Sequence, residues 1–333
     1  MKHLRILNYV DEVARAGSIR KAADRLNVTA SAVNRRIADL EDELGTTLFD
    51  RRPRGVRLTA AGEVFVHYLR GQNGEVERMK SQIEDLKGLR RGTVRIACSQ
   101  ALALEFLPRQ IAEFRKTHPL VSFDLQVVDH EWAMAALAAY EVDLVIVFRP
   151  PFLATFQPLM TLEQQLVVVM AKDHALASRR VLRLSDCAGY PVALPSRSIG
   201  GRQLLDEVSA RTGLTFKIAA EANSFEMLRG LVVHAGMISF QISIGTLPVG
   251  NKLGVIAREI DGRDVPRANL VLGRLRGRTL PIATAVFAER LTRHLEAMRT
   301  ESLAGSVAQS LSARKSEAAA RSKSPMRAVR HSP

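Results

Sequence analysis

The sequence has little cysteine: Cys98 and Cys187 are the only two among 333 residues. Two cysteines cannot build the disulfide framework of a small secreted domain, and so few are typical of a reducing compartment. No run of about 18 uncharged apolar residues occurs, so we expect no membrane span. Asp11 and Glu12 interrupt the first apolar stretch, which a secretory leader would not tolerate. We therefore expect a cytoplasmic protein.

Recognisable catalytic motifs are also lacking. The chain has no G-x-S-x-G elbow, no phosphate-binding P-loop, no H-E-x-x-H and no paired cysteine ligands, and its eight histidines are scattered. We therefore expect no enzyme, no cofactor and no metal. Because a fold does not fix a function, an α/β enzyme with a DNA-binding appendage stays as one alternative.

Positive charge is present in excess, with a formal net charge of +14. A balance of this kind favours a polyanionic partner, such as nucleic acid or an anionic membrane surface. Residues 1–58 hold 12 Lys and Arg against 8 Asp and Glu, and residues 301–333 hold 6 against 2. Part of the excess therefore lies in a tail that has little bulky apolar content, which we expect to be disordered.

Hydrophobic spacing divides the chain into segments. Residues 1–58 are compact and mostly helical, 59–91 read as one long helix, and 92–300 alternate strand and helix patterns. The alternation over 92–300 favours parallel sheets with helices on both faces. The expected architecture is α/β multidomain: a DNA-binding module over 1–58, a linker helix over 59–91, an α/β domain over 92–300, and the tail over 301–333.

The N-terminal module has the pattern of a helix-turn-helix. Ser18 and Thr29 are placed to cap the second and third helices. Asn27 suits the tight turn between them, because Asn tolerates a left-handed backbone. Val33 and Ile37 fall on the buried side of the third helix, which leaves its opposite side free for the major groove. Asn on that side can pair with adenine, and Arg with guanine.

A cationic turn follows the third helix. Arg51-Arg52-Pro53-Arg54-Gly55 lies between two short apolar stretches that predict a β-hairpin wing, whose arginines can contact the phosphate backbone. Solvation alone would also explain the arginines, but their place after a helix-turn-helix favours DNA contact. The expected DNA-binding residues are Ser18, Thr29, Ala30, Ser31, Asn34, Arg35, Arg51, Arg52 and Arg54.

The run from Ala14 through GSIRKAADRLNVTASAVNRRIADLEDELGTTLFDRRPRGVRLTAAG resembles the LysR-type transcriptional regulators without a gap. The layout of the chain to about residue 300 is similar to that family as well. Ala30 stands where the family often has Gln, and Asn34 where it often has Ser. Both departures lie on the expected base-reading side, so the operator sequences of relatives do not predict the operator of this chain.

Thr59 is placed to cap the linker helix. The helix carries a heptad pattern with steps of four and three, which is typical of a coiled-coil seam. Packing against the protein's own body is the alternative. Gly71 and Gly74 weaken the helix and suggest a point of bending. The resemblance also implies dimerisation through this helix, and a tetramer built as a dimer of dimers. The expected dimerisation residues are Phe65, Leu69, Val76, Met79, Ile83 and Leu86.

The resemblance implies two α/β subdomains over 92–300, like those of periplasmic solute-binding proteins. We expect the first at about 92–164 and 269–300, and the second at about 165–268. Ligands of open α/β sheets bind beyond the carboxyl ends of the strands, and helix N-termini and Arg149 favour an anion. The candidate effector-binding residues are Ser99, Gln100, Phe148, Arg149, Ser196, Ser198, Asn223, Ser224 and Ser239.

The sequence thus predicts a transcriptional regulator that binds a dyad-symmetric site on double-stranded DNA and is switched by a small-molecule effector, for which a small organic acid is the candidate. RNA polymerase is a candidate further partner. Redox sensing through cysteine is a second alternative, but neither Cys98 nor Cys187 has the basic neighbours that activate a thiolate.

Overall fold

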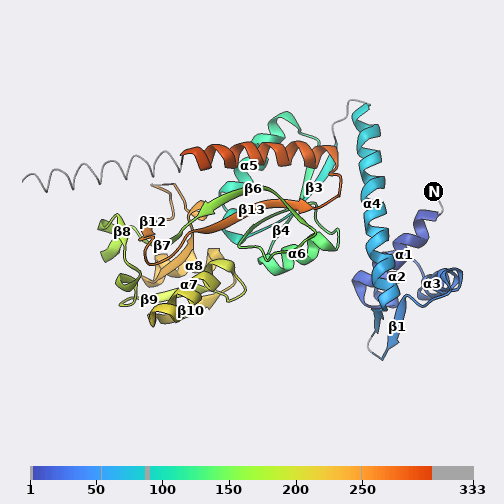
Figure 1. Ribbon diagram of the computed structural model, residues 1–333, viewed down its shortest axis with the longest axis horizontal. Helices are drawn as coiled ribbons and strands as arrows, with labels where there is room; N and C mark the ends of the chain where they lie inside the picture. Colours follow the sequence, from blue (N-terminus) through green and yellow to red (C-terminus); the bar gives the residue numbers. More distant parts are fainter. Residues whose placement is uncertain (1–2, 54, 87–90, 249, 302–333) are drawn as a thin grey trace, which may run out of the picture. The chain divides into compact units, whose positions relative to one another are not determined.

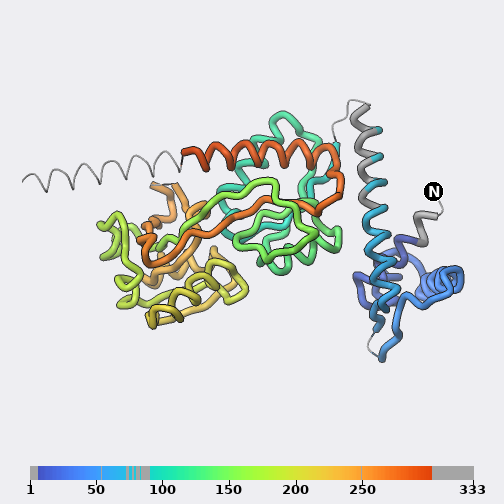
Figure 2. The backbone as a smooth tube through the Cα atoms, viewed as in Figure 1, coloured from blue at the N-terminus to red at the C-terminus, as the bar shows by residue number. Residues whose placement is uncertain are grey.

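The structure is a computed structural model that describes residues 3–53, 55–86, 91–248 and 250–301, traced in Figure 2. Arg54, residues 87–90 and nearly all of the expected tail lie outside the described residues. The chain forms two compact units. Among the described residues, the first comprises those up to Gln157, Arg197–Gly200 and Gly273–Phe287, and the second comprises Pro158–Ser196, Gly201–Leu272 and those from Ala288 on.

The N-terminal module is a winged helix-turn-helix (Figure 1). Its elements are α1 (His3–Ala16), α2 (Ile19–Arg25), α3 (Ala30–Leu44), β1 (Phe49–Arg52) and β2 (Gly55–Leu58). Ser18 accepts a bond from Lys21 N at the start of α2, and Asn27 takes the left-handed φ of 53° that the turn requires. The two strands pair antiparallel from Phe49↔Leu58 to Arg52↔Gly55, so the expected wing forms.

Gly55 is needed where the wing meets the end of α1. Its φ is 137°, and a Cβ atom there would clash with the carbonyl oxygen of Gly17. The backbone of the wing approaches this closely because the Val56 amide donates to that same oxygen at 2.9 Å. Only glycine combines such a φ with such an approach.

The linker helix α4 (Ala60–Leu86) begins as the sequence predicts. The hydroxyl of Thr59 accepts a bond from Gly62 N at 2.9 Å and caps the helix. Its first turns belong to the winged-helix core, because Val66 and Leu69 are 3% and 1% exposed and pack in the same apolar cluster as Val33 and Ile37. The start of α4 is therefore fixed on the DNA-binding module.

The first sheet has five strands in the order β4-β3-β5-β13-β6. The strands are β3 (Gly92–Cys98), β4 (Val121–Val127), β5 (Leu144–Phe148), β6 (Phe156–Gln164) and β13 (Ala268–Leu275). Strand β3 runs parallel to β4 and to β5. The helices here are η1 (Gln100–Leu102), α5 (Phe106–Thr117) and α6 (His130–Ala138). Phe114 of α5, Phe123 of β4 and Phe287 of a helix over 282–301 contact one another edge to face, so two helices cover one side of the sheet.

The second unit contains a six-stranded sheet in the order β10-β9-β11-β7-β12-β8. Its strands are β7 (Leu166–Ala171), β8 (Val181–Leu182), β9 (Pro191–Pro195), β10 (Lys217–Ala222), β11 (Ile238–Ile242) and β12 (Val255–Ile260). Its helices are η2 (Ala175–Ser178), η3 (Leu184–Cys187), α7 (Gly200–Thr212), α8 (Phe225–Ala235) and η4 (Ser243–Gly245).

The expectation of parallel sheets needs correction for this second sheet. Strand β7 runs antiparallel to both of its neighbours, β11 and β12, so the sheet is mixed. A strand that is buried on both faces reads as a continuous apolar run in either direction, and LVVVMA therefore shows no orientation. Among the described residues, no helix combines the length and the apolar character that a membrane crossing requires.

Candidate nucleic-acid interface and effector site

The buried residues of α3 determine which of its other side chains are exposed. Val33, Ile37 and Leu40 are 0%, 3% and 7% exposed, which fixes the rotation of the helix about its axis. The hydroxyl of Thr29 accepts a bond from Ala32 N at 3.2 Å and caps the first turn. Residues 29–31 and Arg35 are exposed, and Asn34 is half-buried on the same side. The first two turns of α3 therefore present hydroxyl, amide and guanidinium groups together.

The wing lies beside this side of α3. Arg51 and Arg52 on β1 are exposed, and Arg51 Nη2 donates to Asn34 Oδ1 at 2.7 Å. The expected phosphate contact and the expected base contact are thus hydrogen-bonded to each other, which no pattern in the sequence predicts. Ser18 caps α2, where its hydroxyl is engaged by the backbone. Arg54 lies outside the described residues.

The expected dimer seam on α4 divides into two parts. Leu69 is 1% exposed in the winged-helix core, and Phe65 is half-buried against that core. Among the described side chains of α4, Met79 (41%) and Ile83 (45%) of the expected seam are exposed, and so are Val64 (72%) and Tyr68 (64%), which were not expected in it. Val76 is half-buried, and the side chain of Leu86 is outside what the structure describes. The exposed stripe is therefore shifted around the helix in the first turns.

Five of the expected effector residues lie in the first unit. Ser99 follows β3 and Phe148 ends β5, and the two strand ends are joined because Phe148 N donates to Ser99 Oγ at 3.2 Å. Gln100 starts η1, and Arg149 takes a left-handed φ of 55°. Ser198 lies in the segment Arg197–Gly200, which belongs to the same unit. Ser99, Gln100, Phe148 and Arg149 gather at the carboxyl ends of neighbouring parallel strands, as the rule for open sheets requires.

His130, which no pattern in the sequence indicates, also lies at this place. It begins α6, is 6% exposed, and its Nδ1 has no hydrogen-bond partner among the residues described. A Cβ atom on Gly200 would lie 3.5 Å from that nitrogen and 2.8 Å from the Phe148 carbonyl oxygen. A lone histidine at the start of an apolar helix gives no signal in the sequence, because only the fold brings it beside Phe148 and Gly200.

The remaining expected effector residues lie in the second unit. Ser196 N donates to Ala222 O at 2.9 Å, which joins the ends of β9 and β10. Asn223 follows β10, and the Ser224 hydroxyl caps α8 by accepting from Met227 N at 3.3 Å. Ser239 is 4% exposed and pairs with Ala193 and Val169 inside the sheet. Ser196, Asn223 and Ser224 are thus at strand ends, whereas Ser239 is within a strand.

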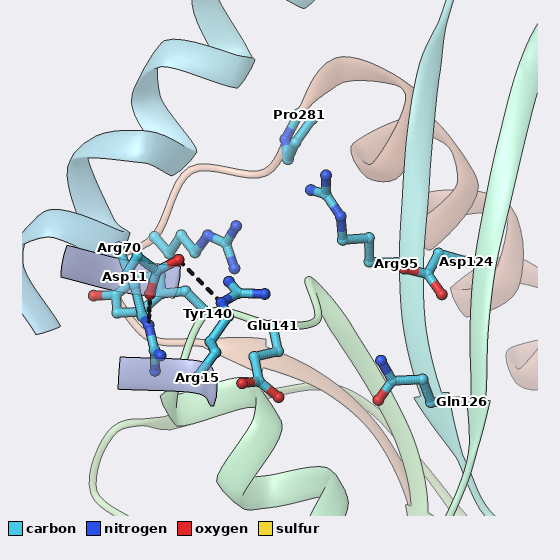
Figure 3. A pocket seen from close by; sticks show the side chains of 10 residues that line it. Asp11, Arg15, Arg70, Arg95, Asp124, Gln126, Tyr140, Glu141 and Pro281 are labelled. Carbon is cyan, nitrogen blue, oxygen red and sulfur yellow. Dashed lines mark hydrogen bonds and ion pairs between the residues drawn. The ribbon is translucent and has the colours of Figure 1, made fainter. Parts of the chain in front are cut away.

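A polar pocket of about 360 Å³ lies elsewhere in the first unit (Figure 3). Its charged groups largely neutralise one another. Asp11 accepts bonds from Arg15 Nε at 3.0 Å and Arg70 Nε at 2.6 Å, and Arg278 pairs with buried Asp143 at 2.6 Å. Burial raises the pKa of Asp143, and the nearby Arg278 and Arg95 oppose that rise. The pocket therefore has little excess charge with which to recruit an ion.

Both cysteines are inaccessible. Cys98 lies in the first sheet and Cys187 in η3, each 0% exposed. Burial raises the pKa of each thiol to about 12, and Asp186 contributes to the rise at Cys187. Because the thiolate is the reactive species, this geometry does not support redox sensing.

The chain combines a capped helix-turn-helix, a basic wing, a long helix and two β-sheets with their helices. This combination defines the class of DNA-binding regulators that carry a ligand-binding domain. Residues 4–63 match the family described as "Bacterial regulatory helix-turn-helix protein, lysR family", and residues 87–296 match "LysR substrate binding domain". The chain belongs to the LysR family of transcriptional regulators, which confirms the resemblance and the expected fold class.

Relatives share this architecture over most of their length. The RuBisCO operon transcriptional regulator of Allochromatium vinosum is 29% identical over 287 residues, which are 86% of this chain and 94% of that protein. Full-length CbnR in complex with its target DNA has a TM-score of 0.58 at 19% identity, covering 87% of this chain and 99% of that one. A full-length variant of OxyR from Pseudomonas aeruginosa has a TM-score of 0.62 at 19% identity, covering 86% of this chain and 93% of that one.

We expect the two thiols to stay unreactive until the protein unfolds. A colourimetric thiol reagent at pH 8 should label neither cysteine in the folded protein and both in denaturant. The folded thiols keep their protons up to about pH 12, whereas unfolded thiols lose them near pH 9. The free energy of unfolding should therefore fall as pH rises above 9, more steeply than in a Cys98→Ala/Cys187→Ala variant. Rapid labelling of the folded protein would contradict this.

Proposed function

We propose that this LysR-family regulator reads a dyad-symmetric operator through the exposed side of α3 and grips the flanking backbone through its wing. The observation that carries the proposal is the rotation of α3, which buries Val33 and Ile37 and leaves Asn34 and Arg35 outward. Side chains in the first turns of such a helix reach base edges when the helix lies in the major groove. Arg51 and Arg52 then supply positive charge beside the phosphates.

The proposed regulator acts as a dimer through α4. The stripe of Val64, Tyr68, Met79 and Ile83 is apolar and exposed, and a second copy of the same helix would remove it from water. A two-fold axis through paired α4 helices places two α3 helices on one duplex, which demands half-sites about one turn apart or a multiple of it. Assembly of two such dimers into a tetramer, and contact with RNA polymerase, belong to the same proposal.

The proposed effector is a small organic acid held at the strand ends. Arg149, with its guanidinium, and the loop after β3 lie at the carboxyl edge of the first sheet, and cations and helix N-termini favour anions. An effector changes DNA binding only through its different affinity for two conformations. The protein would carry out this switching in the cytoplasm.

Two substitutions separate base reading from backbone contact. Asn34→Ala should weaken binding to a selected operator at least tenfold more than to random DNA, because a good base contact is worth about 1–3 kcal/mol of discrimination.

Arg52→Ala should weaken binding to every sequence and reduce the slope of log affinity against log salt by up to about one unit. Fluorescence anisotropy across a salt series measures both. Equal losses for Asn34→Ala on both DNAs would refute base reading.

The dimer face can be tested on α4. Met79→Asp combined with Ile83→Asp should raise the dimer dissociation constant by at least tenfold, because two charges would be buried against a second copy. Sedimentation velocity over a concentration series measures this. Leu69→Ala is the matched control: it should lower the free energy of unfolding by about 2–5 kcal/mol and leave the dissociation constant of folded protein nearly unchanged. The reverse pattern would place the seam at Leu69.

Binding of an organic acid should raise the melting temperature. At a ligand concentration of one hundred dissociation constants, stabilisation reaches about 2.7 kcal/mol, which is several degrees for a domain of this size. In a thermal-shift screen of mono- and dicarboxylic acids on the full chain, Arg149→Met should abolish the shift of any hit. Arg180→Met, at an exposed site of the second unit, should preserve it. If both variants respond like the wild type, the anion does not bind at Arg149.

A further inference from the structure

The bond between Arg51 and Asn34 settles which way the amide of Asn34 points. Arg51 Nη2 lies 2.7 Å from Asn34 Oδ1. A guanidinium has five N–H donors and no acceptor, so the atom that faces it must be the amide oxygen and not the nitrogen. The Nδ2 amino group of Asn34 consequently points away from Arg51. The amide orientation, often ambiguous, is fixed here by chemistry.

Buried contacts hold α3 and β1 together around this bond. Glu41 on α3 accepts through Oε1 from Leu48 N at 2.6 Å and from Phe49 N at 3.0 Å, which ties the start of β1 to the helix that carries Asn34. Leu48 and Phe49 are 1% and 8% exposed and pack in the winged-helix core. The backbones of Arg51 and Asn34 are therefore held at a set distance by buried contacts, and the bond needs no movement of either element.

We propose that Arg51 is a specificity-determining residue that makes Asn34 a hydrogen-bond donor to guanine. The inference rests on the proposed function, in which Asn34 faces a base edge. Bidentate recognition of adenine needs Oδ1 to accept from the N6 amino group and Nδ2 to donate to N7. Arg51 takes one of the two lone pairs of Oδ1 and places its positive charge beside the other, so the pair presents mainly N–H donors and positive charge. Guanine is the base whose major-groove edge presents two acceptors, O6 and N7, to such a pair.

The preferred base differs from the one that Asn34 alone would favour. An unconstrained asparagine on this side of the helix favours adenine, and an unconstrained Arg51 would serve only as a phosphate contact. Each residue keeps its side chain, but Arg51 occupies one lone pair of Asn34 Oδ1 and places a positive charge beside the other, which favours the N–H donor of the amide over its oxygen as the group that contacts the base. A residue that acts through another in this way is a positioning residue, and its loss should change base preference as well as affinity.

Binding-site selection from a random duplex library tests the proposal with full-length protein. Wild-type sites should contain guanine at one position per half-site, and Arg51→Ala should shift that position toward adenine by about tenfold in relative affinity. Arg52→Ala is the matched control: it removes the same charge from the neighbouring residue on β1, and it should lower affinity without changing the preferred base. If Arg51→Ala and Arg52→Ala select the same sites as wild type, the positioning role is wrong.

Asn34→Ala distinguishes failure of this inference from failure of base reading. Loss of preference at the same single position supports both. Unchanged preference in Asn34→Ala overturns base reading by Asn34 and the inference with it. If Arg51→Ala does not fold, 7-deazaguanine at that position tests wild type directly, since it removes the N7 acceptor. Affinity should fall several-fold for wild type and not for Asn34→Ala; an equal response of the two proteins overturns the inference.

Discussion

The anchoring of α3 is the constraint on which the DNA-binding module depends. Val33, Ile37 and Leu40 are buried in the core of the module, and this fixes the rotation of the helix. Thr29 fixes where the helix starts, and Glu41 ties its far end to the wing. Rotation by one residue would turn each side chain by about 100°, so the outward position of Asn34 follows directly from apolar contacts on the opposite side.

The same packing separates the linker helix into a buried first part and an exposed later part. The first turns of α4 contribute Val66 and Leu69 to the winged-helix core, which fixes the start of the helix on the DNA-binding module. Further along, Met79 and Ile83 are exposed. A change in how two such helices pair would therefore be transmitted to the recognition helices without bending between α4 and the wing. Such coupling would link the assembly of the subunits to the position of the recognition helices on DNA.

The proposed effector site of the α/β part lies where strands end. Ser99 and Phe148 are joined across two parallel strands, and His130 lies at the same place with a buried nitrogen that has no partner among the described residues. A buried polar atom without a partner costs about 1–3 kcal/mol, which is a reason to regard this edge as a binding site and not as part of the core. The two cysteines, by contrast, are fully buried, and burial raises the pKa of each thiol to about 12.

Local rules in the sequence determined the helix caps at Ser18, Thr29 and Thr59, the turn at Asn27, the wing and the helix rotation, because each depends on residues a few positions apart. Tertiary structure decided three things that no local pattern encodes. It placed Leu69 in the core instead of the dimer stripe, because burial depends on which surface meets the helix. It set the direction of β7, because a strand buried on both faces carries no directional pattern. It also brought Arg51 to Asn34, because a hydrogen bond between residues 17 positions apart exists only once the wing has folded back against α3.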